Sequence, residues 1–321
     1  MSSTFTERIN FVQRTLGKGQ ISRDGSDITV RCPSCGDSQK KKLAINLETW
    51  KYHCWVCGLK GNTLVSLLKK HGDRSQIDEF RVTFLNSKIL ISDIIPAEDQ
   101  KVDLPDGFTP LVTCLNSKNP NVKAIKRYLE KRGLTERELW KFRVGVSESG
   151  KFSRRPIFAS LDTDGELNYY VSRTIDGKSG LRYLNSTADK TGIVFNDCDI
   201  DWDKKIYLVE GIFDLIALKE NGTCLLGSSI SENSLLFKKI VANESDVVLC
   251  LDNDMLKKTG RIADLLESYG CNVEVMDTSA AKDIAEMNPD QLEYSKSTLS
   301  KWNLASSFKY KIAAIKSGSM F

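Results

Sequence analysis

The sequence predicts an α/β fold built as several consecutive units, and three observations support this class. Residues 201–290 alternate short apolar runs with helical patterns, which is typical of a parallel sheet covered by helices. Four cysteines near the N-terminus form two close pairs, which indicates a small module that binds a metal ion. Residues 118–190 hold 16 basic and nine acidic side chains, whereas residues 201–290 hold nine basic and 17 acidic ones. The basic block suits a polyanion, and the acidic block suits bound cations.

Size and composition agree with a globular chain of about two or three domains. The chain has 321 residues, of which 40% are hydrophobic and 27% are charged. No run approaches the ~18 to 20 apolar residues that span a bilayer, and the start of the chain lacks the pattern of a secretory signal. Nine cysteines without such a signal favour a reducing compartment, so we expect a cytoplasmic protein without a disulfide framework.

The first unit, residues 1–72, contains two cysteine pairs separated by 18 residues, namely Cys32 and Cys35, then Cys54 and Cys57. Each pair can present two thiolates from one turn, and four thiolates complete the tetrahedral shell of one structural Zn²⁺ ion. Residues 43–53 between the pairs are predicted to form a β-hairpin, so the spacing indicates a zinc ribbon. His53 is an alternative zinc ligand. Because its predicted position is in the hairpin, we favour Cys54, the residue that follows it, as the ligand.

Basic and aromatic side chains surround these cysteines. They are Arg31, Lys40, Lys41, Lys42, Lys51, Lys60, Trp50, Tyr52 and Trp55. Aromatic faces can stack on bases while cations bind the phosphates of a single strand. We therefore expect Trp50 and Trp55 to contact nucleic acid. The alternative is that some of these aromatic residues cover the small core of the ribbon.

The middle of the chain is predicted to contain a linker followed by a basic unit. Residues 73–117 are assigned to the linker, because turn formers and acids follow a weakly helical segment there. The basic unit, residues 118–200, opens with a helical pattern over residues 122–134 and continues with short strands separated by Asp-Gly turns. Its excess of positive charge indicates contact with a polyanion.

The last two segments are an α/β unit and a tail. In the unit of residues 201–290 we expect a helix over residues 230–241, with Ser229 in the position of a capping residue. The tail, residues 291–321, holds five lysines and one glutamate together with an apolar pattern. It is predicted either to dock on a partner or to pack back on its own sheet.

Acidic side chains follow the apolar strands of the α/β unit. Glu210 ends one predicted strand, Asp214 lies in the next helix, and Asp252 and Asp254 end another strand. Asp283 follows a third strand. Because the carboxyl ends of parallel strands share one edge of a sheet, these acids are expected to cluster there. Clustered carboxylates suit Mg²⁺ or Mn²⁺, and such ions can assist phosphoryl transfer.

The order of these motifs resembles a known family. EGIFD, LGSSI, DND and KD follow one another as in the Toprim domain, which primases, topoisomerases and some nucleases share. The preceding YLEKRGLTERELWKFRVG, RRPIF, RTIDGKSGLRYLNS and IVFN resemble the basic subdomain of bacterial-type DNA primases. With the cysteine unit in front and no GxxxxGK[ST] helicase motif, the arrangement is similar to that of the separate primases of T-even-type bacteriophages.

The resemblance implies a DNA primase, which synthesises short RNA primers on a single-stranded DNA template from ribonucleoside triphosphates for lagging-strand replication. It implies that Glu210 acts as metal ligand or general base, that Asp252 and Asp254 hold about one to three Mg²⁺ or Mn²⁺ ions, and that Asp214 and Asp283 support them. The residues matched to template and nucleotide binding are Arg132, Arg154, Arg155, Arg173, Arg182, Asn185 and Lys282.

The resemblance also implies partners. A replicative hexameric helicase on a separate chain and a single-stranded-DNA-binding protein are expected to act with a primase of this kind, and a membrane is not. In a phage-encoded chain the compartment is the cytoplasm of the host cell. Ala285 stands where bacterial enzymes often carry a further aspartate, so a third metal ion would depend on Glu286.

Two other functions use some of the same features. A nuclease or topoisomerase shares the acidic motif, but a topoisomerase needs a nucleophilic tyrosine on a further domain, for which 321 residues leave little room. A protein that only loads a helicase onto single strands does not need the acids, and the complete acidic set therefore argues against it.

Overall fold

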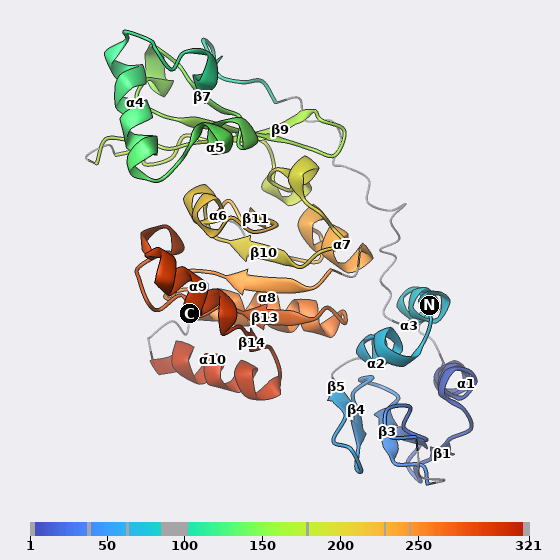
Figure 1. Cartoon of the computed structure of the whole chain (residues 1–321). Coiled ribbons are helices and arrows are strands. Elements are labelled where there is room, and N and C mark those ends of the chain that lie inside the picture. The colour runs from blue at the N-terminus through green and yellow to red at the C-terminus, as the bar shows by residue number, and fades with distance from the viewer. Residues whose placement is uncertain are drawn as a thin grey trace.

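A computed structural model describes residues 4–36, 40–61, 64–84, 102–177, 180–227, 229–243 and 245–316. Within these residues the chain forms three sheets, each in its own stretch of sequence (Figure 1). The first sheet belongs to the cysteine unit, the second to the basic unit and the third to the acidic unit. The third sheet is largely parallel, which confirms the α/β class.

The N-terminal module comprises residues 4–84 as far as the structure describes them. Its five strands are joined in antiparallel order along the chain. The elements are α1 (Phe5–Leu16), β1 (Gln20–Ile21), β2 (Asp27–Val30), β3 (Leu43–Asn46), β4 (Tyr52–Cys54), β5 (Lys60–Gly61), α2 (Leu64–His71) and α3 (Arg74–Phe84). Strands β3 and β4 pair as the predicted hairpin between the cysteine pairs.

Helix α3 extends the module past the predicted boundary at residue 72. Phe80 is fully buried, and its ring lies 5.5 Å from that of Phe11 in α1 and 4.8 Å from that of Trp50. Phe84 completes this aromatic group, with its ring 5.1 Å from that of Trp50. The first part of the segment assigned to a linker is therefore a helix that helps to build the module core.

The basic unit is a four-stranded antiparallel sheet with two helices. Its elements are β6 (Thr109–Pro110), η2 (Leu111–Thr113), α4 (Pro120–Lys131), α5 (Glu136–Lys141), β7 (Val144–Val146), η3 (Gly150–Phe152), β8 (Ile157–Leu161), β9 (Leu167–Ser172), η4 (Lys190–Gly192) and η5 (Asp197–Asp199). Helix α4 confirms the helical pattern predicted over residues 122–134. Strand β6 pairs with β7, so the end of the segment assigned to a linker also belongs to a sheet. Residues 85–101 of that segment lie outside the described residues.

The acidic unit has the strand order β11, β10, β12, β13, β14, in which only β14 runs antiparallel to its neighbour. Its elements are β10 (Ile206–Val209), α6 (Ile212–Leu218), β11 (Gly222–Cys224), α7 (Leu235–Ala242), β12 (Val247–Cys250), α8 (Leu256–Ser268), β13 (Val273–Val275), η6 (Ile284–Glu286), α9 (Pro289–Ser297), β14 (Ser300–Lys301) and α10 (Leu304–Lys316). Helix α7 begins later than predicted, because Ser234 rather than Ser229 caps it and accepts a hydrogen bond from the backbone N–H of Phe237.

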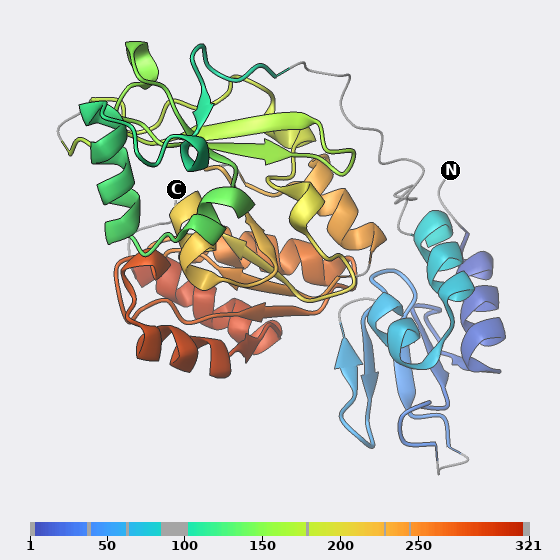
Figure 2. The same ribbon diagram turned by 45° about the horizontal axis from the view of Figure 1, so that its top comes forward.

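One apolar core joins the basic and acidic units, whose ribbons lie side by side in Figure 2. Phe213 of α6 is 5% exposed, and its ring lies 5.4 Å from that of Phe158 in β8 and 6.0 Å from that of Tyr128 in α4. A second core lies between the sheet and helices α7 and α8. Trp302, which belongs to this second core, donates a hydrogen bond from Nε1 to Asp264 of α8.

The segment after residue 290 packs on the acidic unit. Helix α10 lies against α8, where Ser307 and Ala314 are buried. Its other face exposes Leu304, Phe308, Ile312 and Ile315, each by more than half. The structure thus confirms that the tail packs back on its own fold, and docking on a partner stays a prediction. None of the described helices combines the length and the apolar character that crossing a membrane requires.

Candidate metal centres and nucleic-acid interface

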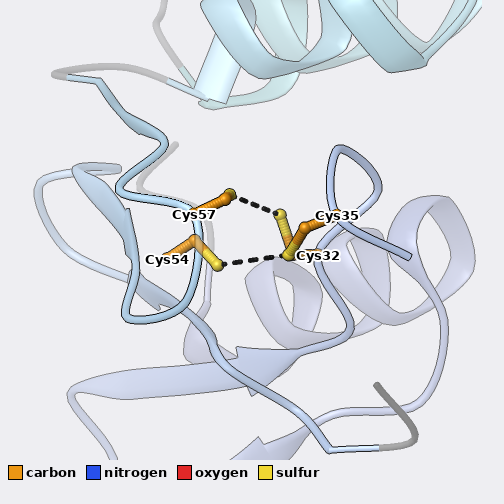
Figure 3. Close-up of side chains that lie close together, drawn as sticks. All are labelled: Cys32, Cys35, Cys54 and Cys57. Atoms are coloured by element: carbon orange, nitrogen blue, oxygen red, sulfur yellow. Dashed lines mark hydrogen bonds between the residues drawn. The ribbon is translucent and has the colours of Figure 1, made fainter. Parts of the chain in front are cut away.

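The four cysteines predicted to bind a metal ion converge. Their sulfur atoms all lie within 4.8 Å of one another, and the Cys32–Cys57 and Cys35–Cys54 sulfur pairs are each 3.8 Å apart (Figure 3). Sulfur atoms that surround Zn²⁺ at ~2.3 Å lie about 3.8 Å apart in a regular tetrahedron. The side chains therefore already have the spacing of a Cys₄ zinc centre.

The turn that carries Cys54 and Cys57 favours a thiolate at Cys54. Burial raises the pKa of Cys54, but hydrogen bonds from the backbone N–H groups of Cys57 and Val56 outweigh burial and lower it to about 7. Gly58 has a φ of 72°, a left-handed conformation that glycine adopts without strain, and its N–H donates to the carbonyl oxygen of Cys54. A thiol that ionises near neutral pH is a ready metal ligand.

Neither histidine of the chain joins this centre. His53 is not part of the ligand cluster, and its ring contacts that of Trp55 at a centroid distance of 4.3 Å. His71 pairs with the hydroxyl of Ser34 through Nε2, at 2.7 Å. The four cysteines are thus the only group of three or more potential ligands that closes around one point in the described part of the chain.

The two tryptophans predicted to contact nucleic acid differ sharply in exposure. Trp55, between the second pair of cysteines, is 72% exposed and can present its ring to a base. Trp50 is only 4% exposed, because Phe80 and Phe84 of α3 cover it. This corrects the expectation for Trp50, which is a core residue of the module.

The acidic side chains lie at the carboxyl ends of neighbouring strands, as predicted. Val209 and Cys250 are register partners in the parallel pair β10 and β12. Glu210 directly follows β10, and Asp252 lies two residues beyond Cys250. Asp283 precedes η6, which contacts α6. Segments that are far apart in sequence therefore bring their carboxylates to one edge of the sheet.

Burial and repulsion between neighbouring carboxylates raise the pKa of two aspartates at this edge. Burial raises the pKa of Asp214 to about 6, and the charges of Asp252 and Asp283 add to the effect. Burial likewise raises the pKa of Asp252 to about 6, with further contributions from Glu210, Asp283 and Asp254. All five predicted acids are therefore close enough to interact. Perturbation of this kind is typical of functional sites.

The acids do not form a closed cage. Three of their oxygen atoms are buried without a hydrogen-bond partner in the described part of the structure: Oε2 of Glu210, Oδ1 of Asp252 and Oδ1 of Asp283. Oε1 of Glu210 lies 3.0 Å from the ammonium group of Lys258 in α8. Unpartnered buried carboxylate oxygens are costly unless a cation approaches them, so this donor set fits Mg²⁺ or Mn²⁺.

Asp214 and Asp254 occupy different positions relative to this group. Oδ2 of Asp214 accepts a hydrogen bond from the N–H of Gly211, and Oδ1 accepts one from the N–H of Ala285. Asp214 thus ties the loop after β10 to the turn that carries Asp283. Asp254 is exposed at the rim, where it is free to approach an ion from the solvent side.

Two of the predicted basic residues contact helix α6, which also carries Asp214. The guanidinium group of Arg132 lies 4.6 Å from the centre of the Phe213 ring, and that of Arg173 lies 5.1 Å from it. Phe213 immediately precedes Asp214 in α6. Arg173 also lies over the ring of Tyr183, which is 40% exposed. Two cations of the basic unit therefore contact the same helix that carries Asp214.

The other predicted binding residues divide into exposed and structural ones. Arg182 and Lys282 are exposed. Arg154 forms a bidentate ion pair with Asp176 and is half-buried. Asn185 accepts a hydrogen bond from the N–H of Ser172.

The prediction that Arg155 binds template or nucleotide requires a correction. It is only 7% exposed, and its guanidinium group donates to the carbonyl oxygens of Leu181 and Arg182. Its charge is therefore directed at the backbone of its own unit, and it holds the exposed segment around residue 182 in place. The sequence alone did not single out Phe213 or Lys258, because their contacts depend on how α6 and α8 pack.

Comparison with known proteins gives a family match within the acidic unit. Residues 207–288 match the Toprim-like family, and this stretch contains all five acids of the sheet edge.

The chain is also similar to bacterial DNA primases. It is 25% identical to that of Halalkalibacterium halodurans over 80% of this chain and 51% of the relative, and 21% identical to that of Listeria innocua over 82% and 51%. The crystal structure of the zinc-binding and RNA polymerase domains of Aquifex aeolicus primase matches 97% of this chain and 91% of its own, with 17% identity and a TM-score of 0.48. The chain is similar in sequence to these bacterial DNA primases over about four fifths of its own length, and it spans about half the length of the curated relatives it matches.

Proposed function

We propose that this chain is a DNA primase that synthesises short RNA primers on single-stranded DNA by metal-dependent nucleotidyl transfer. The observation that carries the proposal is the cluster of acids at the edge of the Toprim-like unit, together with Phe213 in the same helix as Asp214, whose ring two arginines of the basic unit contact. Polymerisation of nucleotides needs cations for a polyanionic template and carboxylates for divalent ions, next to each other. The similarity to bacterial DNA primases over about four fifths of the chain supports the same function.

Glu210, Asp252 and Asp254 are the residues that would hold Mg²⁺ or Mn²⁺. The bound ions supply activation of the attacking 3′-hydroxyl and neutralisation of charge on the phosphate. Asp283 adds a buried, unpartnered oxygen to the same edge. Asp214 positions both loops through its hydrogen bonds to Gly211 and Ala285.

The basic unit would hold the template and the triphosphate. Arg132 and Arg173 contact the ring of Phe213, which precedes Asp214, and Arg182 precedes Tyr183, whose ring is exposed. A base can stack on that ring while the arginines contact phosphates. Lys282, directly before Asp283, would add a cation on the other side of the acids. Arg154 and Asn185 would contribute by shaping the loops that carry these groups.

The N-terminal module would read the template. One structural Zn²⁺ ion bound by the four cysteines would fix the turn that presents Trp55. Exposed lysines such as Lys51 lie in the same module and can contact phosphates while Trp55 stacks on a base. The cysteine centre contributes to folding, because four thiolates leave no open position for a substrate.

The free face of α10 would dock a partner. Leu304, Phe308, Ile312 and Ile315 form an apolar stripe, and Lys309 and Lys316 lie on the same helix. A replicative helicase on a separate chain is the partner we propose, with a single-stranded-DNA-binding protein as a further one. The abundance of free cysteines supports a cytoplasmic location.

The test is synthesis of RNA from ribonucleotides and Mg²⁺ on a random single-stranded template, followed by sizing and sequencing of the products. The wild-type chain should make short RNA, and the Asp252→Ala variant should make none above background. RNA synthesis by Asp252→Ala at the wild-type rate would contradict the metal mechanism. Cleavage of the DNA without any RNA product would instead favour a nuclease, which shares the acidic edge.

A further inference from the structure

Lys258 has an unusual position. It lies in the first turn of α8, where the helix dipole disfavours a positive charge. Its side chain is only 18% exposed, and that of its partner Glu210 is 23% exposed. A lysine that is mostly withdrawn from water against its helix dipole needs a compensating anion, and Glu210 supplies one at 3.0 Å.

The ion pair stands where a metal ion would bind. Lys258 approaches Oε1 of Glu210, whereas Oε2 of the same carboxylate is buried without a partner. Burial and neighbouring acids raise the pKa of Asp252, and the positive charge of Lys258 opposes that rise. The ammonium group therefore compensates part of the negative charge that a divalent cation would neutralise.

We propose that Lys258 is the counter-cation of the metal-free acidic centre, that it competes with the divalent ion for Glu210, and that after its release from Glu210 it binds the triphosphate of the incoming nucleotide. The second half of this inference rests on the proposed primase function. It follows from electrostatics: a partly buried ammonium group that loses its carboxylate partner binds the nearest anion, and a triphosphate held by metal ions at this edge supplies that anion.

The first experiment is a titration of the full chain with Mn²⁺, followed by electron paramagnetic resonance of the free ion. Lys258→Met keeps most of the apolar stem and removes the charge. It should tighten Mn²⁺ binding about tenfold, which corresponds to about 1.4 kcal/mol. Lys258→Arg keeps the charge and should stay near the wild type.

The matched control is Lys257→Met. Lys257 is the preceding residue in the same turn, and it forms no ion pair with any other residue that the structure describes. Loss of its charge should change Mn²⁺ affinity much less. A purely structural role of Lys258 would lower thermal stability in Lys258→Met without tightening Mn²⁺ binding, and Lys258→Gln provides a second neutral variant if the first folds poorly.

The second experiment measures binding of a non-hydrolysable ATP analogue by calorimetry at saturating Mn²⁺. Lys258→Met should bind the analogue about tenfold more weakly than the wild type, because one charge-assisted contact is lost. Lys258→Met therefore shifts the affinities for metal and nucleotide in opposite directions only if the lysine exchanges partners.

The outcomes separate this inference from the proposed function. Equal Mn²⁺ affinity in Lys258→Met and Lys257→Met would overturn it, as would unchanged nucleotide affinity in Lys258→Met. Failure of the wild-type chain to bind Mn²⁺ would overturn the metal centre and this inference together. The expected shifts in both affinities, combined with an absence of RNA synthesis, would leave this inference standing and refute only the primase function.

Discussion

The two candidate metal centres differ in how far the protein alone completes them. The cysteine centre brings four sulfur atoms within 4.8 Å of one another, with two pairs at the spacing of a tetrahedron. The acidic centre leaves three buried oxygen atoms without partners and holds a fourth with a lysine. The first is therefore suited to a permanent structural ion, and the second to ions that arrive with a substrate.

Removal of the ion from the cysteine centre should have the largest effect. Zinc contributes about 10 to 16 kcal/mol to the folding of small zinc modules, and two of the four ligands, Cys32 and Cys54, are part of the core of this module. A strong chelator or Cys54→Ser should unfold residues 4–84 and leave the rest of the chain cooperatively folded. Limited proteolysis with measurement of zinc content checks this.

Cys114→Ser is the control for that experiment, since Cys114 lies outside the cluster. It should keep both the zinc content and the protease resistance of the wild type. A chelated chain whose N-terminal module resists protease as before would contradict the structural role of the ion.

Loss of a carboxylate at the acidic centre should abolish activity while leaving the fold intact. Asp252→Asn should lower primer synthesis by about 10²-fold or more, because transition-state charge is then less well neutralised. Its thermal stability in EDTA should equal or exceed that of the wild type, since repulsion within the acidic group is relieved. The measurements are primer synthesis and thermal unfolding of the same preparations.

Asp277→Asn provides the matched control, because Asp277 follows the neighbouring strand β13 but accepts a hydrogen bond from the N–H of Ser279. It should retain most of the activity. Similar loss in both variants would mean that the effect is not specific to the metal-binding edge.

The stability of the metal-free chain should fall as pH rises. Burial raises the pKa of Asp214 to about 6, above its ordinary value of 3.8, so the folded state binds this proton more tightly than the unfolded state. The stabilising contribution is complete below pH ~4 and is lost as pH rises through about 6, with a size of about 3 kcal/mol for a shift of about two units. Urea unfolding in EDTA between pH 4 and 8 measures it.

Two additions sharpen that titration. Asp214→Asn should flatten the pH dependence, because its side chain does not ionise. Mg²⁺ should restore stability above pH 6, where the carboxylates are charged. A wild-type profile that is flat in EDTA, or that rises across this window, would contradict the arrangement of the acids.

The smallest effect is expected at the exposed tryptophan of the N-terminal module. Trp55→Ala should weaken binding of single-stranded DNA by about 1 to 3 kcal/mol without lowering the stability of the module, because one stacking contact is lost. Fluorescence anisotropy with a labelled oligonucleotide measures the affinity. Trp140→Ala, which removes another exposed tryptophan from the basic unit, should change the affinity less.

The sequence predicted the parts of both centres that depend on local spacing. The cysteine pairs are close in sequence, so the spacing of Cys32 and Cys35 is enough to predict their turn. Glu210 and Asp252 could be placed together because both follow apolar strands of one parallel sheet. These predictions used rules that hold for any chain with the same pattern.

The sequence could not predict contacts that depend on distant packing. The burial of Trp50 depends on α3, a helix in a segment assigned to a linker. The burial of Arg155 depends on the path of residues 181 and 182. The pairing of Lys258 with Glu210 depends on where α8 starts relative to the sheet. In each case the residue type could be read from the sequence, but the residue that it contacts in the folded chain could not.

The ring of Phe213 has a consequence for how the basic and acidic units are held together. It is packed against β8 and α4, is contacted by two arginines, and directly precedes an aspartate of the acidic group. Its bulk therefore sets the separation of the two units at this point of their shared core. Replacing it with a smaller side chain would alter that separation without removing a single charged group.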